Sequence, residues 1–489
     1  MHRTSISALT ILASAALVAC GGGGGGGGQT AGIDGTGIST PEGVVAVGTV
    51  TGFGSVFVNG MRFETSGTSF TIDGSLGTQD DLSVGHVVFV KGTLNVNSST
   101  TGTATQITFD DLVEGPITAG SIDTTASSLI VLGQTVHVTA DTSFDDSIQP
   151  ASLAGLSDGD VVEVSGFRGS DGSIQATRIE TKSPGSEWEV TGIVANLDSV
   201  GFSFDINALS VDYSSALVED FAGGLILNGD LVEVKGSSLS VDGDLIATRV
   251  EFKGDDFAGE DGDRAELEGF ITRFVDTSDF DVAGIPVTTT AGTQYEGGVA
   301  ADLGLDVKVE VEGDINSAGV LVASKVDIRR AKAVRAVALI DSVNTNNDSF
   351  VVLGITVNTD PLTRIEDKSS QDVTPFSVDD LVTGDYVEVR GSELPAGSGR
   401  ILAGLVERED LDTETELQGF VTSETATALV ILGVTISTSG ATVYHDENEA
   451  VITATEFFDR VTVGSLVDAK GSEIGQFAIA ADELEIETE

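Results

Sequence analysis

The chain has 489 residues, a formal net charge of −53 and a hydrophobic content of 40%. This acidity repels phosphate backbones and anionic lipid headgroups, so it excludes nucleic acid as a partner, and it attracts cations. The 61 glycines and the small number of long apolar stretches argue against helix bundles and predict a turn-rich all-β protein. A specific cation site and life in salty water both explain the charge.

The first element in chain order is a leader over residues 1–19. A short basic start and an apolar stretch from Ile6 to Leu17 are typical of a secretory signal, and the stretch is too short to span a bilayer. The sequence LVAC, which ends at Cys20, resembles the lipobox of bacterial lipoproteins. The resemblance implies that the leader is cleaved and that Cys20, the only cysteine, carries the lipid. A buried free thiol is disfavoured because polyglycine follows it directly.

A glycine-rich tether is predicted for residues 20–47. Glycine-rich chains are flexible, and the part from Gly21 to Gly43 has an r.m.s. reach of roughly 25 Å. We therefore expect the folded part to stand clear of the lipid headgroups. Position 21 is Gly rather than Asp, which by resemblance to enterobacterial sorting favours the outer membrane. The sequence leaves open whether the protein faces the periplasm or the cell surface.

Six copies of one strand motif follow the tether. Each is an alternating strand that ends in glycine, at Gly92, Gly166, Gly236, Gly313, Gly391 and Gly471. An alanine starts another half-buried strand ten to twelve residues later, as in ATRIE from Ala176. The copies predict six β domains, at residues 48–111, 115–182, 190–253, 266–330, 335–408 and 416–489.

Two strands joined by a tight turn precede each motif. Asn59-Gly60 is a direct hairpin signal, and copy three has Ala208 where other copies have glycine, so its turn is expected to differ. The strand order resembles that of the OB-fold, a five-stranded barrel with a short helix between strands three and four. A β-sandwich or an open meander would give much the same pattern. We expect six small OB-like barrels that lean on their neighbours in an articulated rod.

Tandem copies of Gly-Asp-x-Val-Glu-Val-x-Gly and Ala-Thr-x-Ile-Glu behind a lipobox resemble an uncharacterised family of bacterial envelope lipoproteins, the "domain of unknown function" repeats. The resemblance covers residues 48 to about 488. Copies four and six depart from it, with Asp306-Val307 and Gly464-Ser465 in place of Gly-Asp. These departures argue against a functional role for this Asp in every copy. The resemblance implies an architecture and a location, and no activity.

No catalytic motif is present in the sequence. It contains no G-x-S-x-G, H-E-x-x-H or P-loop, and its cysteine is assigned to lipid. The histidines after the leader, His86, His137 and His445, lie in different copies, and we predict that they are packed or solvent-facing. Paired carboxylates that hydrolyse a glycosidic bond are recognised only by geometry. We predict that the protein is not an enzyme.

Calcium is the one ion that the sequence suggests. The stretch from Gly254 to Glu266 is rich in acids, and its candidate ligands are Asp255, Asp256, Asp261 and Asp263. The spacing fails the EF-hand pattern, so a solvated linker is the preferred interpretation and no other cofactor is expected. The predicted function is a non-enzymatic, lipid-anchored spacer or scaffold that contacts membrane lipid through Cys20 and other envelope components. The alternative is a surface module that binds calcium or a glycan.

Overall fold

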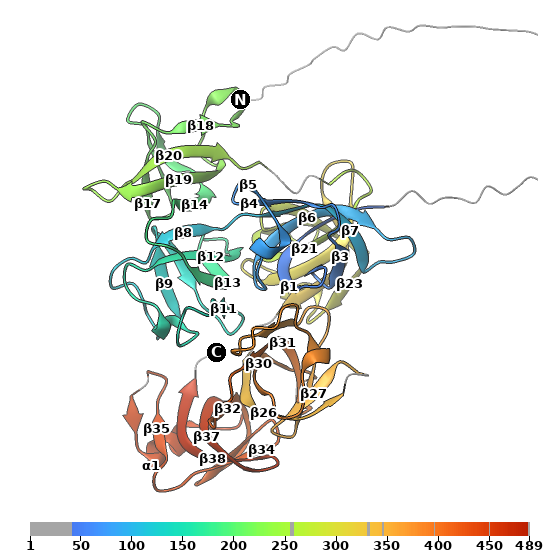
Figure 1. The fold of residues 1–489 in the computed structure, drawn as a ribbon, viewed down its shortest axis with the longest axis vertical. Helices are drawn as coiled ribbons and strands as arrows, with labels where there is room; N and C mark the ends of the chain where they lie inside the picture. Colours follow the sequence, from blue (N-terminus) through green and yellow to red (C-terminus); the bar gives the residue numbers. More distant parts are fainter. Residues whose placement is uncertain are drawn as a thin grey trace, which may run out of the picture. The chain divides into compact units, whose positions relative to one another are not determined.

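The computed structural model describes residues 42–254, 259–329, 333–344, 347–395, 397–448 and 450–487. This part of the chain is all-β, as its composition predicts (Figure 1). Its one α-helix is α1 (Ala454–Arg460), and short 3-10 helices occur in the other repeats. Within the described ranges, no helix has the length and apolar character needed to cross a membrane.

Repeats 1 to 3 contain the first twenty strands. The strands of repeat 1 are β1 (Gly43–Gly52), β2 (Val56–Val58), β3 (Met61–Glu64), β4 (Ser69–Ile72), β5 (Ser75–Gly77), β6 (Val87–Leu94) and β7 (Thr101–Phe109). Those of repeat 2 are β8 (Val113–Pro116), β9 (Ser128–Val131), β10 (Gln134–His137), β11 (Ser143–Phe144), β12 (Val161–Arg168) and β13 (Ile174–Thr181). Those of repeat 3 are β14 (Trp188–Ile193), β15 (Ala195–Asp198), β16 (Ser203–Ile206), β17 (Leu209–Asp212), β18 (Leu217–Glu219), β19 (Leu231–Leu239) and β20 (Leu245–Phe252).

Repeats 4 to 6 contain the remaining strands. Those of repeat 4 are β21 (Arg264–Asp276), β22 (Asp279–Val282), β23 (Ile285–Glu296), β24 (Lys308–Ile315) and β25 (Leu321–Arg329). Those of repeat 5 are β26 (Val334–Asn344), β27 (Ser349–Val352), β28 (Ile355–Asn358), β29 (Arg364–Asp367), β30 (Tyr386–Glu393) and β31 (Arg400–Glu409). Those of repeat 6 are β32 (Thr415–Thr425), β33 (Ala428–Ile431), β34 (Val434–Ser437), β35 (Val443–His445), β36 (Val451–Ile452), β37 (Leu466–Gly475) and β38 (Ala478–Glu487).

Each repeat closes into a small barrel. In repeat 1, β1 pairs antiparallel with both β2 and β6, β7 pairs antiparallel with β6, and β3 runs parallel to β7. The same order closes the other barrels, and in repeat 2 a bridge between Ile117 and Val131 supplies the last link. A short helix precedes the motif strand: η1 (Gln79–Asp81) lies between β5 and β6 in repeat 1, and α1 lies between β36 and β37 in repeat 6. This is the OB-like barrel expected from the sequence, and neither an open meander nor a sandwich.

The final glycine of the motif is required where the last two strands of a barrel approach each other. A Cβ atom at Gly166 would lie 2.2 Å from the carbonyl oxygen of Gln175, and the ladder shifts register there, opposite Ala176. A backbone clash of the same kind would occur at each of the other five motif glycines, Gly92, Gly236, Gly313, Gly391 and Gly471. The glycine and the small alanine opposite it therefore serve barrel closure.

Two other recurring residues also have structural roles. The hydroxyl of Thr142, just before β11, donates to the carbonyl oxygen of Ala176 on β13 at 2.7 Å, so this bond connects the two strands. Equivalent bonds are made by Thr68, Thr293, Thr363 and Thr442. The Asp of Gly-Asp accepts a backbone N–H three residues earlier, as Asp160 does from Ser157 at 2.8 Å. His86 and Ser465 accept the same bond in repeats 1 and 6, so this position is a turn cap.

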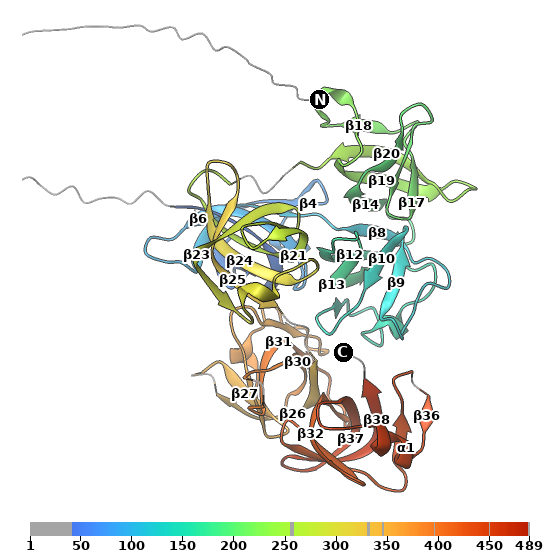
Figure 2. The same cartoon turned by 180° about the vertical axis from the view of Figure 1, so that it is seen from behind.

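The barrels are joined in pairs through their first strands. Antiparallel pairing joins β8 to β14, and thus repeats 2 and 3, and also joins β26 to β32, and thus repeats 5 and 6. Repeats 1 and 4 are joined by parallel pairing of β1 with β21, whose strands lie beside those of repeat 1 in Figure 2. Repeat 1 contacts its neighbour along the chain, repeat 2, as expected, and in addition pairs with repeat 4, which the sequence did not predict. Its first strand has two apolar faces; β21 lies at the edge of this strand, and the core of repeat 4 covers the outer face.

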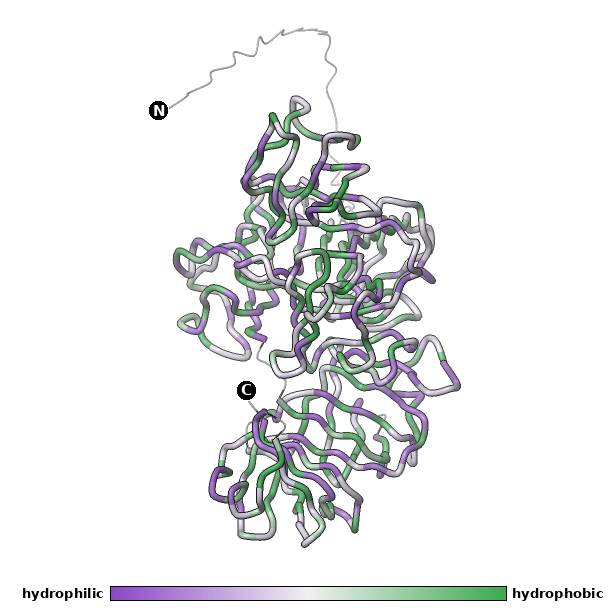
Figure 3. Tube along the Cα trace, turned by 90° about the vertical axis from the view of Figure 1, so that its left-hand side faces the viewer, coloured by the Kyte–Doolittle hydropathy of each residue, from purple (hydrophilic) through white to green (hydrophobic). Residues whose placement is uncertain are grey.

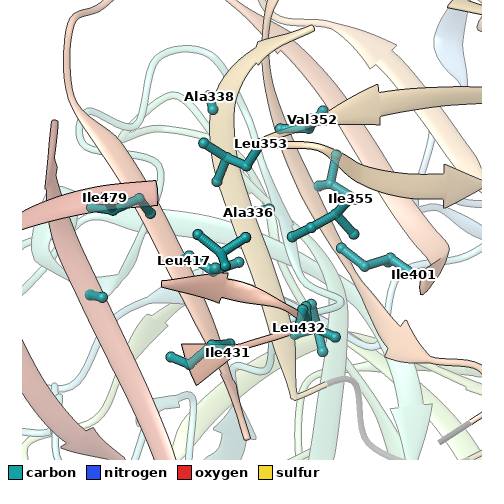
Figure 4. Close-up of a cluster of buried hydrophobic side chains, with 14 of the residues drawn as sticks. Ala336, Ala338, Val352, Leu353, Ile355, Ile401, Leu417, Ile431, Leu432 and Ile479 are labelled. Atoms are coloured by element: carbon teal, nitrogen blue, oxygen red, sulfur yellow. The ribbon is translucent and has the colours of Figure 1, made fainter. Parts of the chain in front are cut away.

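The apolar cores follow this pairing. Figure 3 shows hydrophobic and hydrophilic residues interspersed along the strands, which is the pattern of strands with one face in a barrel. In repeats 5 and 6 a single cluster continues across the junction, where Ala336 of β26 and Leu417 of β32 are paired (Figure 4). Val45 of β1 belongs to the core of repeat 4. Because β1 already begins at Gly43, the predicted tether over residues 20–47 ends too late.

Candidate functional site

The motif strand of most barrels (β12, β19, β24, β30 and β37) carries an acidic side chain that points away from the barrel core and is nevertheless buried. In repeat 2, Val162 and Val164 point inward, and Glu163 between them is only 3% exposed. Four further acids are buried at the same motif position, Glu233, Glu310, Glu388 and Asp468. In repeat 1 this position is Phe89, which packs against the core of repeat 4. The position therefore lies at contacts between barrels.

Each of these acids faces a second acid across the strand ladder. Glu163 is paired with Glu180, and Glu388 with Glu407. The remaining pairs are Glu233 with Glu251, Glu310 with Asp327 and Asp468 with Glu485. Like charges directly opposite each other destabilise a sheet, and burial strengthens the repulsion. Every barrel of this kind needs a cation beside its acid pair.

Repeats 3 to 6 supply that cation from nearby strands. Lys253 Nζ lies 2.5 Å from Glu233 Oε2, and Lys470 Nζ lies 3.5 Å from Asp468 Oδ2. In repeat 4, Arg329 pairs with Glu310. These ion pairs are largely shielded from solvent, so each charged group has given up contacts with water for a direct contact with its partner.

Glu388 in repeat 5 has the strongest cationic environment. Arg335 Nε lies 2.7 Å from its Oε1, and Arg390 contacts the same oxygen. Burial alone would raise the pKa of Glu388, but Arg390 and Arg335 lower it to about 2. Arg335 also pairs with Glu416 of repeat 6, so one guanidinium joins two barrels. This arrangement is a structural ion-pair network in which two arginines outweigh burial at Glu388, whereas burial and repulsion from Asp468 raise the pKa of Glu416 to about 7.

Glu163 in repeat 2 has a different environment. Two acids from the end of repeat 1 approach it, Asp73 after β4 and Asp111 after β7, and the three residues each offer an oxygen within 4.8 Å of the other two. Lys182 Nζ lies 2.6 Å from Glu163 Oε2. Even so, burial, with repulsion from Glu180 and Asp73, raises the pKa of Glu163 to about 7. One lysine does not balance the carboxylates at this junction.

Asp111 is the most unusual member of this group. It is 1% exposed, and neither carboxylate oxygen has a hydrogen-bond partner among the described residues. Burial, followed by repulsion from Glu189, Glu163 and Asp73, raises its pKa well above the usual value. Arg168 is close enough to interact, but its guanidinium donates to backbone carbonyls, including that of Leu112 at 3.2 Å. A buried carboxylate without donors is rare in folded proteins.

His86 borders the group without being suited to bind a metal. Its Nδ1 accepts the N–H of Ser83 at 3.1 Å, and its ring stacks on Phe109 with centroids 4.1 Å apart. Burial lowers its pKa, so the ring is neutral and the proton is on Nε2, which faces Glu180 Oε1 at 3.4 Å. The nitrogen that points at the acids therefore carries hydrogen. Of the two alternatives predicted for this histidine, packed or solvent-facing, the structure shows the packed one.

A second group of acids, in repeat 4, is already neutralised. Glu266, Glu310 and Glu312 also bring one oxygen each within 4.8 Å. Arg264 lies 3.0 Å from Glu266 and 2.9 Å from Glu312, and Lys325 lies 2.9 Å from Glu312. With Arg329 on Glu310, every member has a cationic partner. This group is an ion-pair network.

The acids predicted as calcium ligands do not gather in the described part of the chain. Asp261 is exposed in a turn, and Asp263 Oδ2 accepts the backbone N–H of Glu260 at 2.8 Å. Asp255, Asp256 and the predicted lipid attachment site Cys20 lie outside the described residues. Sequence reasoning missed Asp73, Asp111 and Glu163 as a group. The available signal was the acid within an apolar strand at Glu163, whose burial depends on a neighbouring barrel.

The repeats match one known family along almost the whole described chain. The family is described as a domain of unknown function, DUF5666, and it matches at residues 42–108, 114–180, 191–251, 268–327, 338–407 and 418–485. No curated protein shows a significant similarity to the sequence. The chain belongs to the DUF5666 family, with six tandem copies of its domain.

Proposed function

We propose that this six-repeat chain is a non-catalytic scaffold of the cell envelope, in which paired barrels present surfaces to other envelope components. The observation that supports this proposal is that the recurring motif residues act in barrel closure and barrel contacts. The glycine and alanine allow close strand approach, the threonine bonds the alanine carbonyl, and the acid is buried at junctions. Because the residues that the repeats share have structural roles, they favour a scaffold protein over an enzyme.

A surface depression between repeats 2 and 4 gives little support for catalysis. It has a volume of about 400 Å³ and is lined by residues that include His137, Asp171, Ser173 and Phe270. The hydroxyl of Ser173 donates to Asp171 at 2.7 Å, and no described hydrogen bond joins it to His137. A nucleophile activated by a base needs such a bond. The buried acid pairs, such as Glu163 with Glu180, are covered by protein and leave no room for a sugar between them.

The location that we propose rests on the sequence. A cleaved leader and a lipid on Cys20 would hold the protein at a membrane, most simply the outer one, and the glycine-rich segment would separate the barrels from it. A strong negative charge on the barrels favours distance from anionic headgroups. The anchor and the scaffold are separable parts of the proposal.

The test uses the full chain in cells, with a photo-crosslinking residue at Val241 or Leu76, whose side chains are 100% and 92% exposed. We expect discrete adducts with an envelope protein or glycan. The matched control is the same chain with Cys20→Ser, which we expect to leave the membrane fraction and lose the adducts. Absence of adducts from the anchored chain would overturn the scaffold proposal. Membrane retention of the Cys20→Ser chain would overturn the lipid anchor.

A further inference from the structure

We propose that Asp73, Asp111 and Glu163 bind one calcium ion at the junction between repeats 1 and 2. Asp73 and Asp111 follow the strands β4 and β7 of repeat 1, whereas Glu163 lies on β12 of repeat 2. The ion would therefore connect two barrels that are not paired through their first strands. This site is separate from the acidic stretch near Asp261.

The spacing of the three carboxylates suits one ion. An oxygen from each residue lies within 4.8 Å of the other two. Calcium is bound by oxygens at about 2.3–2.6 Å, so two ligands on opposite sides of the ion are separated by about 4.8 Å. All three side chains can reach a common centre without a change of backbone. The group is preorganised, since the backbone N–H of Asp111 donates to Asp73 Oδ1 at 3.2 Å.

Asp111 provides an independent indication of a ligand. Its side chain is buried, both of its oxygens lack hydrogen bonds, and one of them is among the three that converge. Burying a charged group without a partner costs free energy that folded proteins ordinarily recover with a donor or an ion. The acids of repeats 2 to 6 at the motif position of Glu163 have arginine or lysine partners, whereas neither oxygen of Asp111 has a hydrogen bond among the described residues. At Asp111 a bound cation would fill the same role.

The charge around the group also favours a cation. Lys182 contacts Glu163 and Glu180, and Lys235 contacts Glu189 and Glu233, so each lysine is shared between two acids. Burial raises the pKa of Asp73 to about 6, and repulsion from Asp110 adds to this effect. Protons shared among the carboxylates would relieve the same repulsion, and this is the competing explanation that the test has to exclude.

The ligand chemistry selects the class of ion. The three side chains offer carboxylate oxygens only, and the one nearby imidazole presents a protonated Nε2, so soft or borderline metals gain no nitrogen ligand. Magnesium keeps several waters and is usually held by one or two carboxylates. Three converging carboxylates in a buried position match calcium better.

The experiment measures calcium binding to the full chain in detergent after removal of metal with a chelator. Isothermal titration with calcium chloride at constant ionic strength is expected to show one saturable site. Terbium, which substitutes for calcium, is expected to give emission sensitised by Trp188, the only tryptophan, which adjoins Glu189 of the same junction. Absence of a saturable site, or equal binding of magnesium and calcium, would overturn the proposal.

Variants locate the site. Asp111→Asn keeps the shape of the side chain and is expected to weaken calcium binding by roughly 100-fold or more. Loss of a direct ligand should weaken binding more than loss of a residue that only hydrogen-bonds to a ligand. Asp261→Asn, in the exposed acidic turn, is the matched control and should leave affinity unchanged. If Asp111→Asn does not fold, Asp73→Asn, at a partly exposed position, replaces it.

The competing explanation gives a different result. If shared protons balance the group, Asp111→Asn will not alter the calcium titration, and the wild-type chain will melt at the same temperature with calcium and with chelator. We expect instead a rise in melting temperature that is specific to calcium and absent in the variant. These readings on purified protein are independent of the crosslinks in cells, so either proposal can fail alone.

Discussion

Glu163 and Glu388 occupy the same position in two copies of one motif, and their environments are opposite. Glu388 is held between Arg335 and Arg390, which lower its pKa to about 2. Glu163 has Lys182 on one side and the acids of repeat 1 on the other, and its pKa is raised to about 7. The comparison teaches that the motif fixes a buried carboxylate and leaves the neighbouring barrel to determine how its charge is balanced.

The largest effect is expected from removing the arginine that two barrels share. Arg335→Met leaves Glu388 and Glu416 without their shared guanidinium in a buried junction. We expect the free energy of unfolding to fall by about 3 kcal/mol, because an unpaired buried charge is strongly destabilising. Denaturant unfolding followed by circular dichroism measures the change. A double variant with Glu416→Gln should recover part of the loss, because Glu416 loses its ion pair with Arg335 whereas Arg390 still holds Glu388, and no recovery would contradict the role given to Arg335.

The second-largest effect is a change in stability that is expected to differ in sign between the two glutamates. Glu388→Gln removes a charge held by two arginines and should destabilise the protein by about 2 kcal/mol. Glu163→Gln, in chelator, removes a charge that neighbouring acids repel and should leave stability unchanged or raised. Thermal melts of both variants in the same buffer test the contrast. Equal losses would mean that the two positions are equivalent.

The pH dependence sharpens the same contrast. Because folding raises the pKa of Glu163 from 4.5 to about 7, its contribution to stability is present below pH 4.5 and is lost as pH rises toward 7. Folding lowers the pKa of Glu388 from 4.5 to about 2, so its contribution is present above pH 4.5 and is lost as pH falls toward 2. Melting temperatures of wild type minus each Gln variant, in chelator, should show these opposite slopes. Parallel slopes would contradict the assignment.

The smallest effect is expected where the two repeats are alike. Thr142 donates to the carbonyl of Ala176 at 2.7 Å in repeat 2, and Thr363 donates to that of Ala403 at 2.8 Å in repeat 5. Replacing either threonine with valine should cost about 1 kcal/mol. The two losses should agree, because this bond belongs to the barrel and not to the junction. Chemical denaturation measures both, and a clear difference would show that the barrels themselves are not equivalent.

Residues that act within one barrel could be predicted from the sequence. Alternation around Glu163, the glycine at Gly166 and the turn at Asn59-Gly60 specify strands and their order, because these contacts are local or recur in every copy. The turn at Ala208 differs as expected, since only Asn207 before it has a positive φ, of 51°. Such features need no knowledge of what surrounds the barrel.

Residues that act between barrels could not be predicted in the same way. The outward position of Glu163 resembles a solvent-facing position until a second barrel covers it, and Asp111 is the last residue assigned to the first copy, outside any recurring motif. The partnership of repeats 1 and 4 depends on surfaces far apart in the chain. Its one local signal was the run of apolar residues Val44 to Val47, which has no polar face and so indicates a strand covered on both sides.

The parallel pairing of β1 with β21 has a consequence for the order of assembly. Thr49 and Glu268, which are joined by a hydrogen bond at this junction, are 219 residues apart in the chain. Repeats 2 and 3 can dock as soon as both have been synthesised, whereas repeat 1 keeps an uncovered strand edge until repeat 4 has been made. An uncovered edge invites pairing with other chains. The first repeat to be synthesised is thus among the last to be completed, and until then its edge is open to other chains.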